Sequence, residues 1–269
     1  EKQFFFMEAH NGISAKLVEK HKFDGIWASG LTISSSMGLR DVNEMSWSQV
    51  CEILNYITLS SDLPVILDAD TGYGSFNNTI HLTKHLDRIG IQGICIEDKI
   101  FPKKNSFFQG HKQPLEDIEI FSGKIKSIKD SSSNIQVVAR IESLIAGWGM
   151  DEAIKRANAY REAGADAILI HSKRKDISEI DEFIKTWGSE FPIVLVPTTY
   201  YKTKPNYFLK NKINIVIWAN HLLRSSISSM EETLQIVKKN KSLKKIENKI
   251  FPVNEIFNIT KMQELTNNE

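Results

Sequence analysis

Three acidic residues stand directly after short apolar runs of the sequence. Asp68 and Asp70 follow the run 65–67, and Glu97 follows the run 93–96. A spacing of two places both aspartates on the same side of an extended chain. Carboxylates brought together raise one another's pKa or need a cation, and a site made of carboxylate oxygens suits Mg²⁺ better than Zn²⁺. The pattern therefore predicts a magnesium site, although any one of these aspartates alone would as readily cap a helix.

Two basic side chains follow other apolar runs. Arg140 comes after 136–139 and His171 after 167–170. A guanidinium fork matches carboxylate or phosphate oxygens. Taken singly, each could be a paired structural residue, and His171 would be a core histidine. Together with the acids, they predict a receptacle for a small substrate that carries several negative charges, such as a phosphate and a carboxylate.

Two connections add further polar groups. The connection 98–113 contains Lys103, Asn105 and Ser106, and loops beyond about 12 residues without structure of their own often cover active sites. We expect a lid there, with a plain surface loop as the alternative. Asp41 lies in another connection, where it could act as a nucleophile, a base or a support for other groups.

Eight apolar runs must position these residues, and amphipathic stretches separate them. The expected strands are 4–7, 25–28, 65–67, 93–96, 136–139, 167–170, 193–196 and 215–218. The expected helices are 15–20, 47–58, 78–88, 115–129, 152–162, 177–187 and a long one at 226–239. Gly90 and Gly164 each stand between a helical stripe and an apolar run, where glycine ends a helix.

This alternation predicts a single-domain α/β protein, a (β/α)8 TIM-type barrel over residues 1–240, followed by a C-terminal helical tail over 241–269. In such a barrel the polar residues after each strand meet at one rim. The alternative is an open doubly wound sheet, but its Gly-x-Gly-x-x-Gly motif is missing after the first strand.

Composition excludes several classes of protein. The 269 residues carry a formal net charge of +1, so they show no basic footprint for nucleic acid. No apolar run approaches the ~18 residues of a membrane-spanning helix, and we expect a cytoplasmic protein that does not bind membranes. Cys51 and Cys95 are expected in the core, because a chain of this length folds without disulfides.

At these residues the chain resembles the phosphoenolpyruvate mutase family of the isocitrate lyase superfamily. The resemblance extends from about Phe6 to Phe257. Its most specific part is the stretch 97–106, Glu-Asp-Lys-Ile-Phe-Pro-Lys-Lys-Asn-Ser, which matches the mutase signature Glu-Asp-Lys-x-x-Pro-Lys-x-Asn-Ser. The segments 27–31, 68–74 and 196–198 are also similar to family segments, with Ala28 as a minor departure.

The resemblance implies a Mg²⁺-dependent barrel that interconverts phosphoenolpyruvate and phosphonopyruvate. By position, Asp68 would contact Mg²⁺ directly, while Asp70 and Glu97 hold its waters. The substrate carboxylate would lie against Ser29, Gly30 and Leu31, near Trp27. The phosphoryl group would be held by Arg140, His171 and Asn105, with Ser106 also binding substrate. Lys103 would help to close the lid. Asp41 would be the nucleophile, unless the reaction follows a dissociative route.

Three other functions are alternatives to this one. Phosphonopyruvate hydrolase shares the signature except for the asparagine matched by Asn105. Carbon–carbon lyases of the superfamily carry a cysteine in the equivalent loop, where this chain has none. A barrel that binds anions without turnover is the non-enzymatic alternative. The resemblance also implies a homo-oligomer, a tetramer or a dimer, in which the C-terminal helix around 226–239 is exchanged between subunits.

Overall fold

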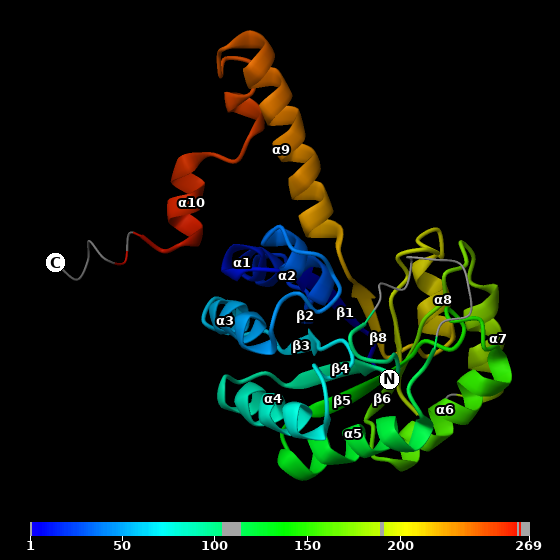
Figure 1. Cartoon of the computed structure of the whole chain (residues 1–269). Helices are drawn as coiled ribbons and strands as arrows, with labels where there is room; N and C mark the ends of the chain where they lie inside the picture. The colour runs from blue at the N-terminus through cyan, green and yellow to red at the C-terminus, as the bar shows by residue number, and fades with distance from the viewer. Residues whose placement is uncertain (1, 104–113, 189–190, 263, 265–269) are drawn as a thin grey trace. The chain divides into compact units, whose positions relative to one another are not determined.

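The computed structural model describes residues 2–103, 114–188, 191–262 and 264 (Figure 1). Its strands are β1 (Phe4–Ala9), β2 (Gly25–Ala28), β3 (Val65–Asp68), β4 (Gly93–Glu97), β5 (Gln136–Ile141), β6 (Ala167–Ile170), β7 (Ile193–Leu195) and β8 (Ile215–Trp218). Its α-helices are α1 (Gly12–Lys20), α2 (Gly30–Ser36), α3 (Trp47–Thr58), α4 (Phe76–Arg88), α5 (Ile118–Ser131), α6 (Met150–Glu162), α7 (Ser178–Trp187), α8 (Pro205–Lys210), α9 (His221–Asn240) and α10 (Val253–Ile259). A 3₁₀ turn, η1, spans Glu247–Lys249.

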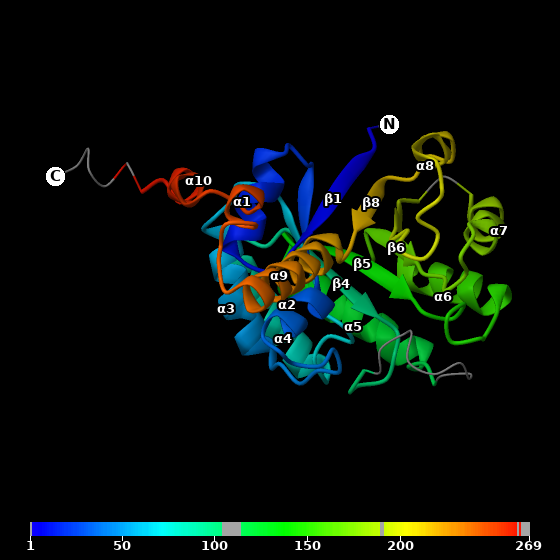
Figure 2. The same cartoon turned by 90° about the horizontal axis from the view of Figure 1, so that it is seen from above.

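The eight strands close into a barrel. Each strand pairs in parallel with the next, and β8 pairs with β1 through the register Phe4 to Ile215. Strands buried on both sides read as continuous apolar runs, which is why the sequence located each of them to within two residues. The predicted (β/α)8 fold is confirmed, and Figure 2 shows the helices of the barrel outside its strands.

Apolar side chains fill the barrel interior. The main cluster consists of Phe6, Trp27, Ile66, Cys95, Val138, Ala167, Leu169, Val194, Val196 and Ile217. Cys95 is 1% exposed and Cys51 2%, so both lie in the core as expected. Because the interior is packed, polar chemistry is confined to the ends of the strands.

Two short helices were not predicted. In α2 the sequence Gly-Leu-Thr-Ile-Ser-Ser-Ser has weak helix formers, and in α8 only six residues are helical. Ser29 caps α2 by accepting a hydrogen bond from the Thr32 N–H at 3.4 Å. By contrast, Gly90 and Gly164 follow helices with φ of 76° and 102°, as predicted for helix ends.

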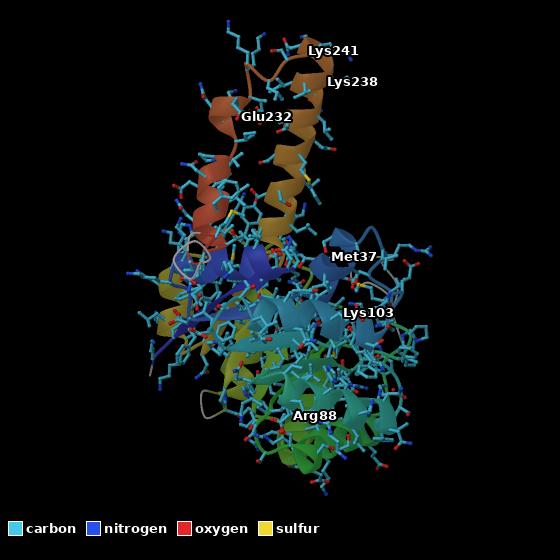
Figure 3. The ribbon with its side chains drawn as sticks, turned by 90° about the vertical axis from the view of Figure 1, so that its left-hand side faces the viewer. Met37, Arg88, Lys103, Glu232, Lys238 and Lys241 are labelled. Carbon is cyan, nitrogen blue, oxygen red and sulfur yellow. The ribbon has the colours of Figure 1, made fainter. Side chains whose placement is uncertain are left out.

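The chain divides into two compact units, residues 1–220 and 221–269. The boundary predicted from the sequence lies near residue 240, and the second unit of this division begins with α9. Within the second unit, Lys238 and Lys241 are exposed (Figure 3). Lys249 Nζ lies 4.0 Å from Glu232 Oε1. These lysines form a solvated surface. None of the helices among the described residues combines the length and the apolar character that crossing a bilayer requires.

Candidate active site

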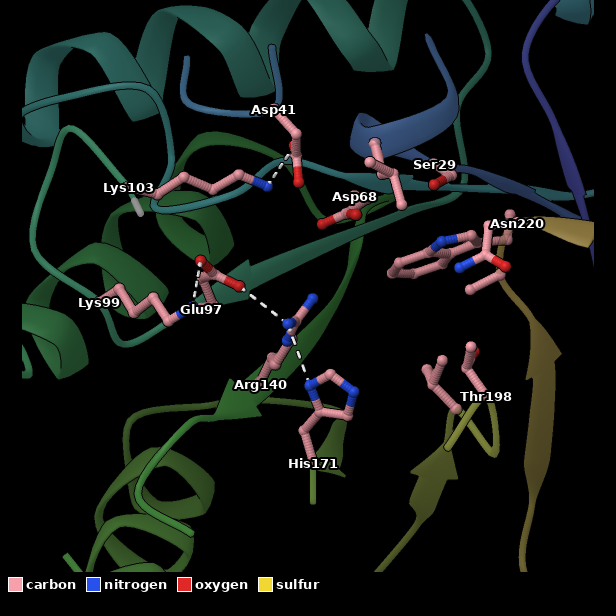
Figure 4. Close-up of a pocket in the computed structure, with 14 residues that line it drawn as sticks. Ser29, Asp41, Asp68, Glu97, Lys99, Lys103, Arg140, His171, Thr198 and Asn220 are labelled. Atoms are coloured by element: carbon pink, nitrogen blue, oxygen red, sulfur yellow. Dashed lines mark hydrogen bonds and ion pairs between the residues drawn. The ribbon is translucent and has the colours of Figure 1, made fainter. Parts of the chain in front are cut away.

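A pocket opens at the carboxyl ends of the strands (Figure 4). It is lined by Trp27, Ser29, Leu31, Asp41, Asp68, Glu97, Lys99, Lys103, Arg140, His171, Val196, Thr198, Ala219 and Asn220. The side chains come from seven of the eight strand ends and from two loops, so only closure of the barrel brings them together. Asn105 and Ser106 lie outside the described residues, as does most of the predicted lid.

The acidic side of the pocket is formed around Asp68. Its Oδ2 accepts a hydrogen bond from the Gly30 N–H at 3.3 Å. Burial raises the pKa of Asp68, and the charges of Glu97 and Asp41 add to this effect, while Lys103 and Arg140 oppose it. Burial thus disfavours the charged form of Asp68, and the charges of Lys103 and Arg140 favour it.

Asp70 lies beside Asp68 but has different partners. The chain turns after β3, with Asp70 in the left-handed region at φ 52°. A Cβ atom added to Gly30 would lie 3.2 Å from Asp70 Oδ1 and 3.5 Å from Asp68 Oδ2, so both carboxylates approach the same backbone position. Asp70 is paired with the Lys103 ammonium. Burial raises the pKa of Asp70 to about 7, because it outweighs the attraction of Lys103.

Lys103 connects the acidic side to a loop. Its Nζ lies 2.7 Å from Asp41 Oδ1 and also contacts Asp70. Burial lowers the pKa of Lys103, but the charges of Asp70, Glu97, Asp41 and Asp68 outweigh it and raise that pKa well above its usual value. Lys103 is therefore a permanent cation, even though only 6% of its side chain is exposed.

The basic side of the pocket is formed by Arg140 and His171. Arg140 Nη2 lies 3.3 Å from Glu97 Oε2 and 3.1 Å from His171 Nδ1. Burial lowers the pKa of His171, and the Arg140 charge lowers it further, against the opposing effect of Glu142. The imidazole is therefore neutral at pH 7. A fixed cation and a neutral ring face the pocket from adjacent strands.

Glu142 holds this basic side together, and no role was predicted for it from the sequence. It is fully buried, with Oε1 2.7 Å from Arg140 Nε and 3.2 Å from His171 Nδ1, and with Oε2 3.1 Å from Lys99 Nζ. Burial raises the pKa of Glu142, but Arg140, Lys99 and His171 outweigh it and hold that pKa well below its usual range. The sequence contained one indication of this role. Glu142 stands two residues after Arg140 at the end of β5, a spacing that places both side chains on one face.

Three other residues of the site were assigned no role from the sequence, although Thr198 stands in a segment similar to the family and Asn220 follows a predicted strand. Thr198 follows β7 and Asn220 follows β8, and both line the pocket. Thr198 Oγ1 is buried and makes no hydrogen bond within the described structure. Asn43, from the loop between α2 and α3, hydrogen-bonds to Asp70 and to Lys103. No spacing rule marks Asn43, because its partners are 27 and 60 residues away.

The donor set fits a magnesium ion bound mainly through water. Among the described residues, no three His, Cys, Asp or Glu side chains stand close enough to enclose a metal ion. Asp68 and Asp70 nevertheless meet at Gly30, and Glu97 Oε1 is buried without a hydrogen bond from the described chain. Mg²⁺ commonly takes one or two carboxylates and fills its other positions with waters and substrate oxygens. Hard oxygen donors of this kind satisfy that requirement.

Comparison with known proteins gives consistent matches over the whole chain. The family model described as phosphoenolpyruvate phosphomutase matches residues 1–238. Phosphoenolpyruvate phosphomutase of Tetrahymena pyriformis is 49% identical over 263 residues, which cover 97% of this chain and 88% of that protein.

Two solved structures show the same fold. Phosphoenolpyruvate phosphomutase from Streptomyces platensis subsp. rosaceus superposes with a TM-score of 0.97 at 38% identity, covering 100% of this chain and 94% of that one. Phosphonopyruvate hydrolase in complex with oxalate and Mg²⁺ superposes with a TM-score of 0.91 at 36% identity, covering 98% and 92%.

Proposed function

The chain belongs to the phosphoenolpyruvate phosphomutase family, and from this we propose that it interconverts phosphoenolpyruvate and 3-phosphonopyruvate. The reaction breaks the bond between phosphorus and the enol oxygen and forms a bond between phosphorus and carbon 3, with no net gain or loss of protons. The observation that supports it is one buried pocket in which Asp68 and Glu97 face Lys103, Arg140 and His171.

We propose that the substrate carboxylate lies at the start of α2, against Ser29, Gly30 and Leu31. Backbone N–H groups at the first turn of a helix have no partner within the helix and favour anions. Ser29, Leu31 and Trp27 line the pocket. This arrangement would anchor the pyruvate part of the substrate while the phosphoryl group moves.

Arg140 and His171 would hold the phosphoryl group in transit. In phosphoryl transfer the moving group is loosely bonded and its three oxygens carry the charge, so catalysis is mainly positioning and charge stabilisation. Phosphoryl oxygens only accept hydrogen bonds, so His171 must present its Nε2–H. Nδ1 must then accept from Arg140 Nη2 at 3.1 Å, because a hydrogen bond from Nδ1–H to Glu142 Oε1 at 3.2 Å belongs to the other tautomer.

Mg²⁺, when bound by Asp68 and supported by Asp70 and Glu97, would neutralise the oxygens of the substrate and of the transition state. Asp68 and Asp70 supply hard oxygens at one point of the rim. Lys103 adds a positive charge on the same side and pairs with Asp41. That pairing gives Asp41 an electrostatic connection to the site, and the choice between a nucleophilic and an electrostatic role is left to experiment.

A ³¹P NMR experiment tests the function. Purified protein incubated with phosphonopyruvate and Mg²⁺ should produce phosphoenolpyruvate, and omission of Mg²⁺ should abolish turnover. An Asp41→Asn variant in the same assay tests whether the Asp41 carboxylate is required, and a phosphorylated Asp41 in rapidly quenched unmodified protein would assign it the nucleophilic role. Release of inorganic phosphate and pyruvate without phosphoenolpyruvate would contradict the mutase assignment.

Phosphonopyruvate hydrolase is the second candidate, favoured by the fold shared at 36% identity. The mutase signature, including Asn105, and the 49% identity to a mutase outweigh it. Carbon–carbon lyase activity is not favoured, because this chain has no cysteine in the loop where those lyases carry one.

We further propose that the chain forms a homo-oligomer through its C-terminal unit. Apolar side chains on that unit are exposed, including Met230 and Leu234 on α9 and Phe257 on α10. A second copy that covered these side chains would bury apolar surface, which favours association. Light scattering of the full chain should give a mass of two or four subunits, and a monomeric mass would refute the proposal.

A further inference from the structure

The Asn43 side chain joins two parts of the pocket wall that are distant in sequence. Its Nδ2 donates a hydrogen bond to Asp70 Oδ2 at 2.7 Å, and its Oδ1 accepts one from the Lys103 N–H at 2.8 Å. The side-chain amide is thus used at both of its ends. A neutral amide is one of the few side chains that donate and accept at once.

These contacts complete a closed arrangement around Lys103. The backbone N–H of Lys103 is held by Asn43, while its Nζ is held by Asp41 and Asp70. A buried ammonium is stable only when its partners are placed accurately, because removing its charge from water is costly. Asn43 therefore fixes both the start of the Lys103 side chain, through the backbone, and the acid that meets its end.

The backbone at Asn43 supports a specific use of asparagine. Its φ is 60°, in the left-handed region that few residues other than glycine, asparagine and aspartate enter readily. Ala or a β-branched residue would add backbone strain to the loss of the amide. Glycine and aspartate adopt this φ, so variants with these residues separate the amide's contribution from the backbone's.

We propose that Asn43 is a positioning residue that sets Lys103 between Asp41 and Asp70 and thereby orders the acidic side of the active site. The proposal rests on the proposed function for its kinetic consequences. Asn43 lies outside the set of pocket-lining residues and acts through Lys103. Loss of the amide would leave the basic side, Arg140 and His171, in place.

Two variants test the hydrogen bonds of the Asn43 side chain, one removing both and the other removing only the donor. Asn43→Gly deletes both without strain. Asn43→Asp keeps the acceptor for Lys103 and replaces the donor by a carboxylate that repels Asp70. Both should lower kcat about 10–100-fold, the usual cost of losing a group that orients a catalytic ligand, while KM changes by less than about 3-fold because Arg140 and His171 still bind substrate.

Asn134→Asp is the matched control. Asn134 Nδ2 donates to Asp87 Oδ1 at 3.0 Å on the exposed surface, so the variant makes the same chemical change away from the pocket. Its kcat and KM should match those of the unmodified chain. If the unmodified chain and this control both lack mutase turnover, the proposed function fails, whatever Asn43 does.

A double-mutant cycle with Lys103→Met tests the mechanism. If Asn43 acts mainly through Lys103, adding Asn43→Gly to Lys103→Met should lower kcat by much less than it does in the unmodified chain, the remaining loss coming from the Asp70 hydrogen bond. The same cycle measured on urea unfolding should also be non-additive, and this readout needs no turnover. Wild-type kcat in Asn43→Gly, or additive effects in both cycles, would overturn the proposal.

Discussion

Glu97 and Asp98 are adjacent in sequence and equally buried, at 2% and 0% exposed, but they belong to different charge networks. Glu97 faces the pocket, where it meets Arg140 at 3.3 Å and Lys99 at 3.8 Å. Asp98 belongs to the other network, formed with Arg156 and Tyr160 of α6. Alternation at the end of β4 directs consecutive side chains to opposite sides.

The two networks differ in how many of their carboxylate oxygens accept hydrogen bonds from the protein. Asp98 Oδ1 accepts the Glu142 N–H at 2.9 Å, and its Oδ2 accepts Tyr160 OH at 2.8 Å and Arg156 Nη1 at 3.0 Å. Glu97 Oε1 makes no hydrogen bond within the described structure. A buried polar atom that makes no hydrogen bond costs stability. We infer that the Asp98 network serves the fold and that the pocket acids are retained for what they bind.

The largest expected effect is that of Asp68→Asn on turnover. Removing the proposed direct ligand should lower kcat about 10³-fold, since a bound metal contributes several kcal/mol to transition-state stabilisation. The metal-free variant should be as stable as the unmodified chain or more so, because burial already disfavours the charged carboxylate. The ³¹P assay measures turnover, and thermal unfolding measures stability. A clear loss of stability with retained turnover would reverse the assignment of the two networks.

Arg156→Met should produce the opposite pattern. It leaves Asp98 buried without its cation, which should cost about 3 kcal/mol in the free energy of unfolding, while kcat of the folded protein stays within about 3-fold. Arg88→Met on the exposed end of α4 is the control (Figure 3) and should cost less than about 0.5 kcal/mol. Urea titration measures both. Equal midpoints for the two variants would show that the Asp98 network contributes nothing to stability.

Glu142→Gln tests the residue that connects the two networks. Its backbone N–H belongs to the Asp98 network, and its carboxylate holds Arg140, Lys99 and His171. Loss of the charge should lower kcat/KM about 10–100-fold, mainly through KM, because the side proposed to bind the phosphoryl group loses its support. Steady-state kinetics measure the split. An effect on kcat alone would place Glu142 with the acids that act in the chemical step.

The smallest expected effect is a pH dependence of stability that arises from Asp70. Its pKa of about 7 in the fold lies above the unfolded value of about 3.9, so the folded chain binds this proton more tightly. The fold is therefore more stable at low pH. Its free energy of unfolding falls as pH rises through 7, by about 1 kcal/mol between pH 6 and 8.

Urea titrations of the metal-free protein at these pH values measure it. Asp70→Asn should remove this slope, and Mg²⁺ should reduce it in the unmodified chain. The same pH dependence in Asp70→Asn would assign the titration to another group.

The fold was largely readable from the sequence. Buried parallel strands are recognisable as apolar runs, and the polar residue that follows each of them is also evident, so Asp68, Glu97, Arg140 and His171 could be assigned to one rim. The short helices α2 and α8 were not readable, because tertiary packing and a serine cap stabilise them rather than intrinsic propensity.

The partners within the site were not readable from the sequence. Asn43 reaches Lys103 across 60 residues, and Glu142 meets His171 across 29. Such contacts depend on the path of the loops and on the stagger of neighbouring strands, which no local pattern encodes.

The sequence by itself determined the barrel, the acids and bases at its rim and the family signature. Only the tertiary structure decided that Glu97 enters the pocket while Asp98 enters a closed network, and that Lys103 and Asn43 hold Asp70. The physical reason is that the chemistry of a side chain is set by its own residue type. An ion pair instead needs two charges within a few ångströms of each other, and only the closed barrel brings these charges that close.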